Sequence, residues 1–214
     1  GAMHQNTTGE YNVAVGMCSN YNSLTGGTNT FIGALAGLAN KGSSNTSLGY
    51  STLRCNQAGC YNTAIGINSM YYNTNGTYNS ALGYAALHCN TTGVQNTATG
   101  IESLKNNTTG SYNVAAGTGA LCSNTSGSCN VAMGRIALRS NTTGCCNVAI
   151  GEAAMCKNTT GIRNVAMGRA ALFNITTGCY NVGLGYVAGD SITTGCKNIA
   201  IGAFSLQALT TNSS

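Results

Sequence analysis

The sequence repeats itself with a period of seventeen residues. Twelve times an Asn is followed four residues later by a Gly, and successive anchors keep this spacing, except that the interval after Asn29 is one residue shorter. The anchoring residues are Asn12, Asn29, Asn45, Asn62, Asn79, Asn96, Asn113, Asn130, Asn147, Asn164, Asn181 and Asn198. We number the consensus N-V-A-I-G-x-x-A-L-x-x-N-T-T-G-x-x from position 1 to position 17. Such regular repetition predicts a stack of similar units rather than a globular core.

Each repeat has the pattern of a short extended segment. Position 2 is Val, Thr, Ser or Ile, position 4 is mostly Val, Ile, Leu or Met, and position 3 is usually Ala, which predicts a strand. Positions 8 and 9 predict a second short strand, and N-T-T-G predicts a turn. We therefore expect an all-β fold, a parallel β-solenoid (β-roll) of twelve 17-residue coils. At about 4.8 Å per coil, the rod would be roughly 55–60 Å long.

The interior of such a coil is thin. We expect the larger apolar side chains at positions 2, 4 and 9 to fill it, which leaves Ala at position 3 and Gly at position 5 on a smooth outer face. A core this narrow offsets chain entropy poorly, and a smooth face suits close packing against another sheet. We therefore expect the chain to associate with itself as a homotrimeric fibre.

Composition narrows the function classes. Charged residues make up only 6% of the chain, and nine basic residues against four acidic ones are too sparse for a nucleic-acid surface. The sequence contains no run of about 18 apolar residues, so it predicts no membrane-spanning segment. The carboxylates of Glu10, Glu102, Glu152 and Asp190 are isolated from one another, so we expect no enzyme and no cofactor. Residues 1–11 are interpreted as a tag scar, from the opening Gly-Ala-Met, plus a lead-in, and residues 12–214 as a single solenoid domain.

The repeated motif resembles known fibre proteins. "NVAIG" and "NVAMG" resemble the "NSVAIG" repeats of trimeric autotransporter adhesin heads of the YadA type, and the whole repeat is similar to the "NTAIGYxALxxNTTG" arrays of phage, giant-virus and bacterial tail-fibre-like proteins. In the adhesin heads, the resemblance implies a parallel β-roll, three chains per fibre and a role in surface attachment. The coils here are longer than the roughly fourteen-residue adhesin coils, because N-T-T-G is added.

Equal positions of successive coils stack into columns. The Asn column at position 1 is expected to form an amide ladder. Position 6 places Arg135, Glu152 and Arg169 on three successive coils, which predicts a surface ion ladder or, alternatively, a basic binding patch. Tyr61, Tyr78, Tyr112 and Tyr180 share position 17. These tyrosines either cover the edge of the thin core or stack on sugars, so ligand binding is assigned to them and to Arg135 and Arg169.

Ten of the eleven cysteines flank the N-T-T-G turn. If the turn is a tight reversal, positions 11 and 16 face each other, as do positions 10 and 17. This predicts the disulfides Cys55–Cys60 and Cys122–Cys129, while Cys179 and Cys196 share position 16 and could bridge adjacent coils instead. The alternatives are that cysteine serves as a small apolar filler in a reducing compartment or, less in keeping with the spacing, binds metal.

These observations predict a structural or adhesive fibre segment. We expect it to be extracellular, either on a cell surface or in a virion or tail fibre. Its partners would be further copies of itself and a surface glycan or receptor. The alternative is an ice-binding solenoid, because Thr pairs at positions 13 and 14 form ranks along the rod.

Overall fold

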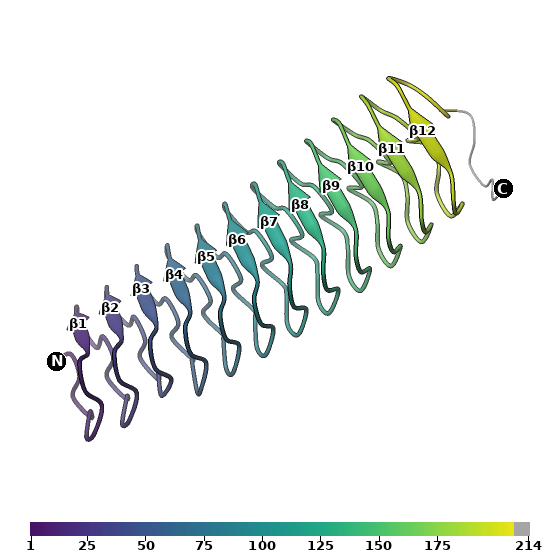
Figure 1. Ribbon diagram of the computed structural model, residues 1–214. Helices are drawn as coiled ribbons and strands as arrows, with labels where there is room; N and C mark the ends of the chain where they lie inside the picture. Colours follow the sequence, from purple (N-terminus) through teal and green to yellow (C-terminus); the bar gives the residue numbers. More distant parts are fainter. Residues whose placement is uncertain (208–214) are drawn as a thin grey trace.

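Each repeat forms one coil of a parallel β-solenoid. The computed structural model describes residues 1–207, and its coils stack into a rod with the N-terminus at one end (Figure 1). Each coil contributes one three-residue strand, at positions 2 to 4. The strands are β1 (Val13–Val15), β2 (Thr30–Ile32), β3 (Thr46–Leu48), β4 (Thr63–Ile65), β5 (Ser80–Leu82), β6 (Thr97–Thr99), β7 (Val114–Ala116), β8 (Val131–Met133), β9 (Val148–Ile150), β10 (Val165–Met167), β11 (Val182–Leu184) and β12 (Ile199–Ile201).

The twelve strands form one parallel sheet in sequence order from β1 to β12. Each strand residue pairs with its equivalent in the next coil, as Val131 does with Val148 and Val148 with Val165. Between β2 and β3 the partner is one residue closer in the sequence than elsewhere, and the pairing of Thr30 with Thr46 still holds. The all-β solenoid predicted from the repeat is therefore confirmed, and equal repeat positions do stack into columns.

The inward and outward faces of the strands are the reverse of those predicted. Ala149 at position 3 is fully buried, whereas its neighbours Val148 and Ile150 at positions 2 and 4 are only half-buried. The core consists of the position-3 column, Ala or Ser at position 8, and Leu or Met at position 9. The reason is the width of the interior. At Gly183, which takes position 3 of its coil, even an added Cβ atom would lie 2.7 Å from Leu172 Cγ.

The predicted second strand at positions 8 and 9 is also absent. These residues form a turn, because positions 7 and 9 adopt left-handed backbone angles, as in Ala153 (φ 57°) and Met155 (φ 48°). Left-handed angles are incompatible with a strand. Position 17 has the same conformation, as in Tyr112 (φ 61°) and Arg163 (φ 56°). These three left-handed positions in each coil let a short repeat close around a narrow core.

Glycine at position 5 has a different reason. Gly151 has φ +127°, and a Cβ atom there would lie 2.6 Å from the carbonyl carbon and oxygen of Gly168 in the next coil. Only glycine lets the backbones of adjacent coils approach this closely at the end of the strand.

Two columns of buried asparagines run through the rod. The predicted ladder at position 1 is confirmed: the backbone N–H of each Asn donates to Oδ1 of the Asn before it, and in every step but the one to Asn45 the Nδ2 does so too, as Asn147 donates to Asn130 at 3.0 and 3.2 Å. A second ladder was not predicted. At position 12, Asn141 Nδ2 donates to Asn124 Oδ1 at 2.8 Å and also to Gly144 O at 3.0 Å, which closes its own turn. The Asn of N-T-T-G is therefore part of the core.

Candidate binding surface

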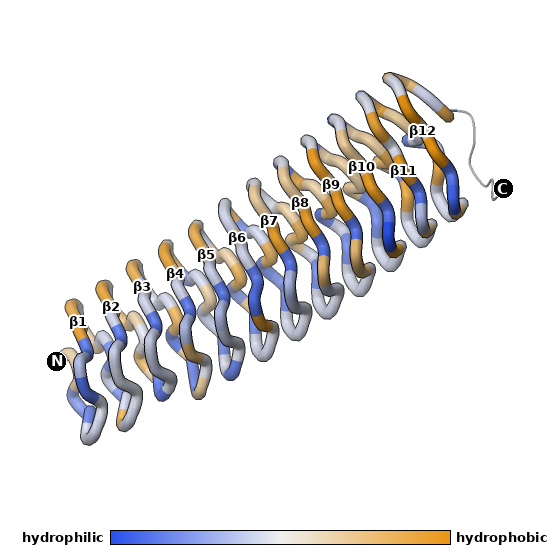
Figure 2. Tube along the Cα trace, in the orientation of Figure 1, coloured by the Kyte–Doolittle hydropathy of each residue, from blue (hydrophilic) through white to orange (hydrophobic). Residues whose placement is uncertain are grey.

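The side chains at positions 2 and 4 of the twelve strands form one outward-facing surface, which we call the strand face. Val13 and Val15 of β1 are 50% and 57% exposed, and Ile199 and Ile201 of β12 are 66% and 67% exposed. Between them, Ile32, Leu48, Leu82, Val114, Met133 and Met167 are also exposed. A hydrophobic band follows the strands along the rod (Figure 2). No charged residue occupies position 2 or 4 in any coil.

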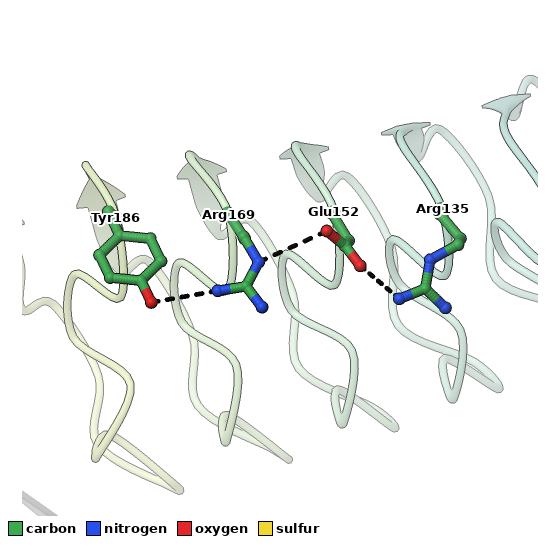
Figure 3. Close-up of polar contacts among 4 residues, drawn as sticks. All are labelled: Arg135, Glu152, Arg169 and Tyr186. Carbon is green, nitrogen blue, oxygen red and sulfur yellow. Dashed lines mark hydrogen bonds and ion pairs between the residues drawn. The ribbon is translucent and has the colours of Figure 1, made fainter.

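The predicted ion ladder at position 6 is present beside the strand face. Arg135 and Arg169 lie on either side of Glu152 (Figure 3). The Arg135 guanidinium donates to Glu152, and Arg169 Nε lies 3.4 Å from Glu152 Oε2. The hydrogen bond and charge of Arg135, assisted by Arg169, lower the pKa of the Glu152 carboxyl. Both arginines are thus engaged with the carboxylate, which leaves two positive charges against one negative charge.

Aromatic rings extend this column. Arg169 also donates to the Tyr186 hydroxyl at 3.1 Å, and its guanidinium carbon lies 5.6 Å from the centre of the Tyr186 ring. Phe204, at position 7 of the next coil, packs edge-on against Tyr186 at 5.1 Å between ring centroids. The position-6 column is therefore continuous from Arg135 to Tyr186, and Phe204 packs against its end from the neighbouring position.

The position-17 tyrosines behave mainly as a structural column. Tyr61 and Tyr78 stack with ring centroids 4.9 Å apart and planes 4° apart, so each ring covers a face of the other. Tyr180 accepts a hydrogen bond from Arg163, whose guanidinium carbon lies 5.3 Å from the ring centroid. Tyr112 lies between Gln95 and Cys129 in the column and is 56% exposed. Tyr61 and Tyr78 are exposed to the same extent as Tyr112, and sugar binding by the four tyrosines stays a prediction.

A cluster at positions 10 and 11 was not predicted. Arg54, Tyr71 and His88 occupy position 10 of consecutive coils, with the Arg54 guanidinium carbon 5.4 Å from the Tyr71 ring and the Tyr71 and His88 rings 5.3 Å apart. Tyr72 packs edge-on against both rings, at 4.5 and 5.2 Å. This column varies strongly from coil to coil, which hid it in the consensus. Comparing position 10 alone along the chain would have revealed it.

The cysteines are all free thiols in the structure. This includes the predicted disulfide residues Cys55, Cys60, Cys122, Cys129, Cys179 and Cys196, so their pairing stays a prediction. Position 16 has a role that the sequence did not reveal: a backbone N–H donates to the side chain at position 16 of the next coil. Val94 donates to Ser111 Oγ at 3.1 Å, and Ser43 donates to Cys60 Sγ at 3.3 Å. The Cys60 sulfur therefore accepts the same hydrogen bond that the Ser111 hydroxyl accepts in its coil.

The threonine ranks at positions 13 and 14 are only partly available to a ligand. Thr108 and Thr142, at position 13, donate their hydroxyls to the carbonyls of Thr125 and Thr159 in the following coils, at 2.9 and 3.0 Å. One rank of hydroxyls is therefore used to join the coils. This arrangement gives no support to an ice-binding surface at the turn.

The described part of the rod has no pocket in which a small molecule could be enclosed. Among residues 1–207 there is no cluster of three or more His, Cys, Asp or Glu side chains that could hold a metal ion. The same residues contain no helix with the length and apolarity of a membrane span. No protein-family model, curated protein or solved structure matches the chain.

Proposed function

We propose that this chain is a shaft or head segment of a homotrimeric fibre that attaches to a cell surface. The observation that carries the proposal is the strand face: twelve stacked strands with exposed Val, Ile, Leu, Met and Thr side chains and no charge. Large, contiguous apolar patches on a protein surface usually mark sites of interaction with another molecule. The face is therefore the surface through which copies of the chain pack together.

The size of the strand face supports this role. At about 4.8 Å per coil, twelve strands extend over roughly 55 Å, and a strip two side chains wide has an area on the order of 500 Å². This is as large as the largest apolar patches of monomeric proteins, which often mark interfaces. Three copies that turn this face toward a common axis would each bury it against the other two. The resemblance of the repeat to trimeric adhesin heads supports the same number of chains.

The packing surface in this proposal differs from the one predicted from the sequence. Ala at position 3 is enclosed within each coil, so it has no part in contacts between chains. The exposed side chains at positions 2 and 4 take its place. The remaining sides of the rod, with the aromatic and cationic columns at positions 6, 10 and 17, stay exposed in such a trimer and are available to a glycan or protein receptor.

Light scattering tests the assembly. We expect about three times the mass of one chain for the wild type, and a monomer for the double variant Met133→Lys/Met167→Lys, in which two charges enter the strand face. Both side chains are 45% exposed, so the variant should keep the coil itself intact. Thr160→Lys, at an exposed turn position away from the strand face, is the matched control and should remain trimeric. A folded wild-type monomer would overturn the proposal.

A glycan array and binding to cells test the attachment function. The assembled trimer should bind, and Tyr112→Ala or removal of the ring cluster by Tyr72→Ala should weaken binding without changing the mass. A trimer that binds neither glycans nor cells would be a shaft segment without adhesive function.

A further inference from the structure

The thiols of two cysteine pairs lie on adjacent coils at the same repeat position. Cys129 and Cys146 share position 17, and Cys179 and Cys196 share position 16. Because the coils stack in register, each pair is separated along the rod by one coil spacing. This relation differs from that of cysteines that flank one turn, since it brings together residues a full repeat apart in the chain.

Cys129 and Cys146 are both exposed. The residues that follow them, Asn130 and Asn147, are joined by the position-1 ladder at 3.0 Å, and the Cys146 backbone N–H donates to Ser128 O at 3.0 Å. The register of the two coils is therefore set immediately beside the thiols. Partial desolvation raises the pKa of the Cys129 thiol, and the neighbouring Cys146 and Cys145, with a hydrogen bond to Cys146, raise it further.

Cys179 and Cys196 are in equally direct contact. The backbone N–H of Cys179 donates to Cys196 Sγ at 3.2 Å, and the Lys197 N–H donates to Cys179 O at 2.9 Å. A hydrogen bond with the Cys196 thiol, more than burial, raises the pKa of Cys179.

No other two of the eleven cysteines have this relation. Cys55 and Cys89 at position 11, and Cys122 and Cys156 at position 10, are each two coils apart. Two coils correspond to about 9.6 Å, which is beyond the roughly 6.8 Å between Cα atoms that a disulfide spans. Cys18, Cys60 and Cys145 have no cysteine at the same position of an adjacent coil.

We propose that Cys129–Cys146 and Cys179–Cys196 are oxidation sites at which a disulfide joins one coil to the next, so that Cys129 pairs with Cys146 in place of Cys122, the partner predicted from the turn. The coil spacing of about 4.8 Å lies within the Cα range of about 4.4–6.8 Å that disulfides accept. The Cβ atoms of disulfides lie about 3.5–4.5 Å apart, with a mean of about 3.8 Å, so closing the bond requires the two side chains to approach by about 0.3–1 Å. The inference stands on the positions of the thiols and does not depend on the proposed function.

The oxidant would be a small-molecule disulfide such as oxidised glutathione. A thiolate of the pair attacks one sulfur of the small disulfide, which forms a mixed disulfide and releases one small thiol. The second cysteine then attacks the protein sulfur of the mixed disulfide and displaces the second small thiol. Two protein thiols are oxidised, one small disulfide is reduced, and the two protons end on the released thiols.

Thiol counting after this oxidation tests the proposal. Because the pKa values of Cys129 and Cys179 are raised, the reaction is run at about pH 9, where thiolate is available. Alkylation and mass measurement of the denatured protein should give eleven free thiols in the reduced protein and seven after oxidation. After trypsin, one disulfide should lie within residues 170–197, and the other should link the peptides 106–135 and 140–157, with fragmentation placing it at Cys129 and Cys146.

Single variants provide matched controls. Each has ten thiols before oxidation, and Cys129→Ser should keep eight afterwards, because Cys146 loses its partner. Cys60→Ser, which has no cysteine neighbour in its column, should fall to six, as both pairs remain. Eleven thiols in oxidised wild type would overturn the proposal. So would a bridge at Cys55–Cys60, Cys122–Cys129 or Cys145–Cys146, or one between chains on a non-reducing gel.

Discussion

Phe31 is the one large side chain in a column of small ones. It occupies position 3, where most coils have Ala, and it is fully buried. Its own coil compensates at position 9, where Gly37 replaces the usual Leu or Met. A Cβ atom at Gly37 would lie 2.7 Å from two carbons of the Phe31 ring, so the ring fills the space that Leu fills elsewhere. The large apolar group of a coil can therefore enter from either the strand or the turn.

This exchange predicts strong coupling between the two sites. Phe31→Ala alone should cost about 3–5 kcal/mol of unfolding free energy through the cavity that it leaves. Gly37→Leu alone should cost about 1–3 kcal/mol by overpacking. The double variant Phe31→Ala/Gly37→Leu restores the Ala and Leu of the other coils, and Leu121 shows that Leu accepts the left-handed angle (φ 51°). It should be close to wild type in denaturant unfolding. Simple addition of the two losses would contradict this account of the core.

Among the structural elements, the two asparagine ladders differ in the groups that donate to each Oδ1 atom. At position 1, Asn130 Oδ1 accepts both the backbone N–H and Nδ2 of Asn147. At position 12, Asn124 Oδ1 accepts only Nδ2 of Asn141. This difference explains why position 1 is Asn in all twelve coils while position 12 becomes Ile175 and Ile192 near the C-terminal end. The cost of that change is local: Asn158 Oδ1, where the ladder stops, has no hydrogen-bond partner.

We therefore expect Asn130→Ala to be more destabilising than Asn124→Ala. Both remove a side chain of the same size from the core. Asn130→Ala removes four side-chain hydrogen bonds, one of them from the buried backbone N–H of Asn147, whereas Asn124→Ala removes three. One hydrogen bond contributes about 0.5–1.5 kcal/mol, and this is the expected difference between the variants in urea unfolding. Equal losses would show that the backbone bond adds nothing to the ladder.

Much of each element was predictable from the period alone. Once a chain repeats at a fixed, short period in an extended conformation, equal positions must stack, so the strand at positions 2 to 4, the position-1 ladder and the Arg135–Glu152–Arg169 column all follow. Each of these depends on spacing along the chain. None of them depends on which way a side chain points.

The direction of the side chains was not predictable in the same way. The alternation Val-Ala-Ile defines two faces, and larger apolar residues usually face the core, which led to the wrong face. The deciding quantity is the width of the coil, and this follows from left-handed angles at residues such as Leu121 and Met155, which ordinary side chains do not signal. The Asn of N-T-T-G was missed for a related reason, since turn chemistry alone explains its presence.

On the scale of the whole molecule, the rod is a one-dimensional stack. Each strand pairs only with those of the preceding and following coils, so stability is expected to be a sum of contributions from coils and their interfaces. The coil that begins at Asn29 shows how such a stack absorbs a missing residue. Its turn is Asn40-Lys41-Gly42, one residue shorter than N-T-T-G, yet Asn40 Nδ2 still closes it on Gly42 O at 2.7 Å. The next ladder step keeps its backbone bond, from Asn45 N to Asn29 Oδ1 at 2.9 Å, while Asn45 Nδ2 donates to Gly59 O at 2.9 Å.

A single-residue deletion should therefore be tolerated in the turn and not in the strand. Deleting Thr142 reproduces the short turn. It removes the hydroxyl and backbone bonds that Thr142 donates to Thr159 O, and the carbonyl that accepts from Thr125, Ser126 and Gly127. Thr143 then occupies the shortened turn, so the melting temperature should fall by about 5–15 °C while the cooperative transition is kept. Deleting Ala132 instead moves Met133 to the inward position, where the coil has space only for a small side chain. It also breaks the pairing of β8 with β7 and β9. We expect the rod to lose its cooperative transition around these coils, measured by circular dichroism on heating. If the two deletion variants show the same thermal transition, the coil interior accepts larger side chains at position 3 than its buried alanine column indicates.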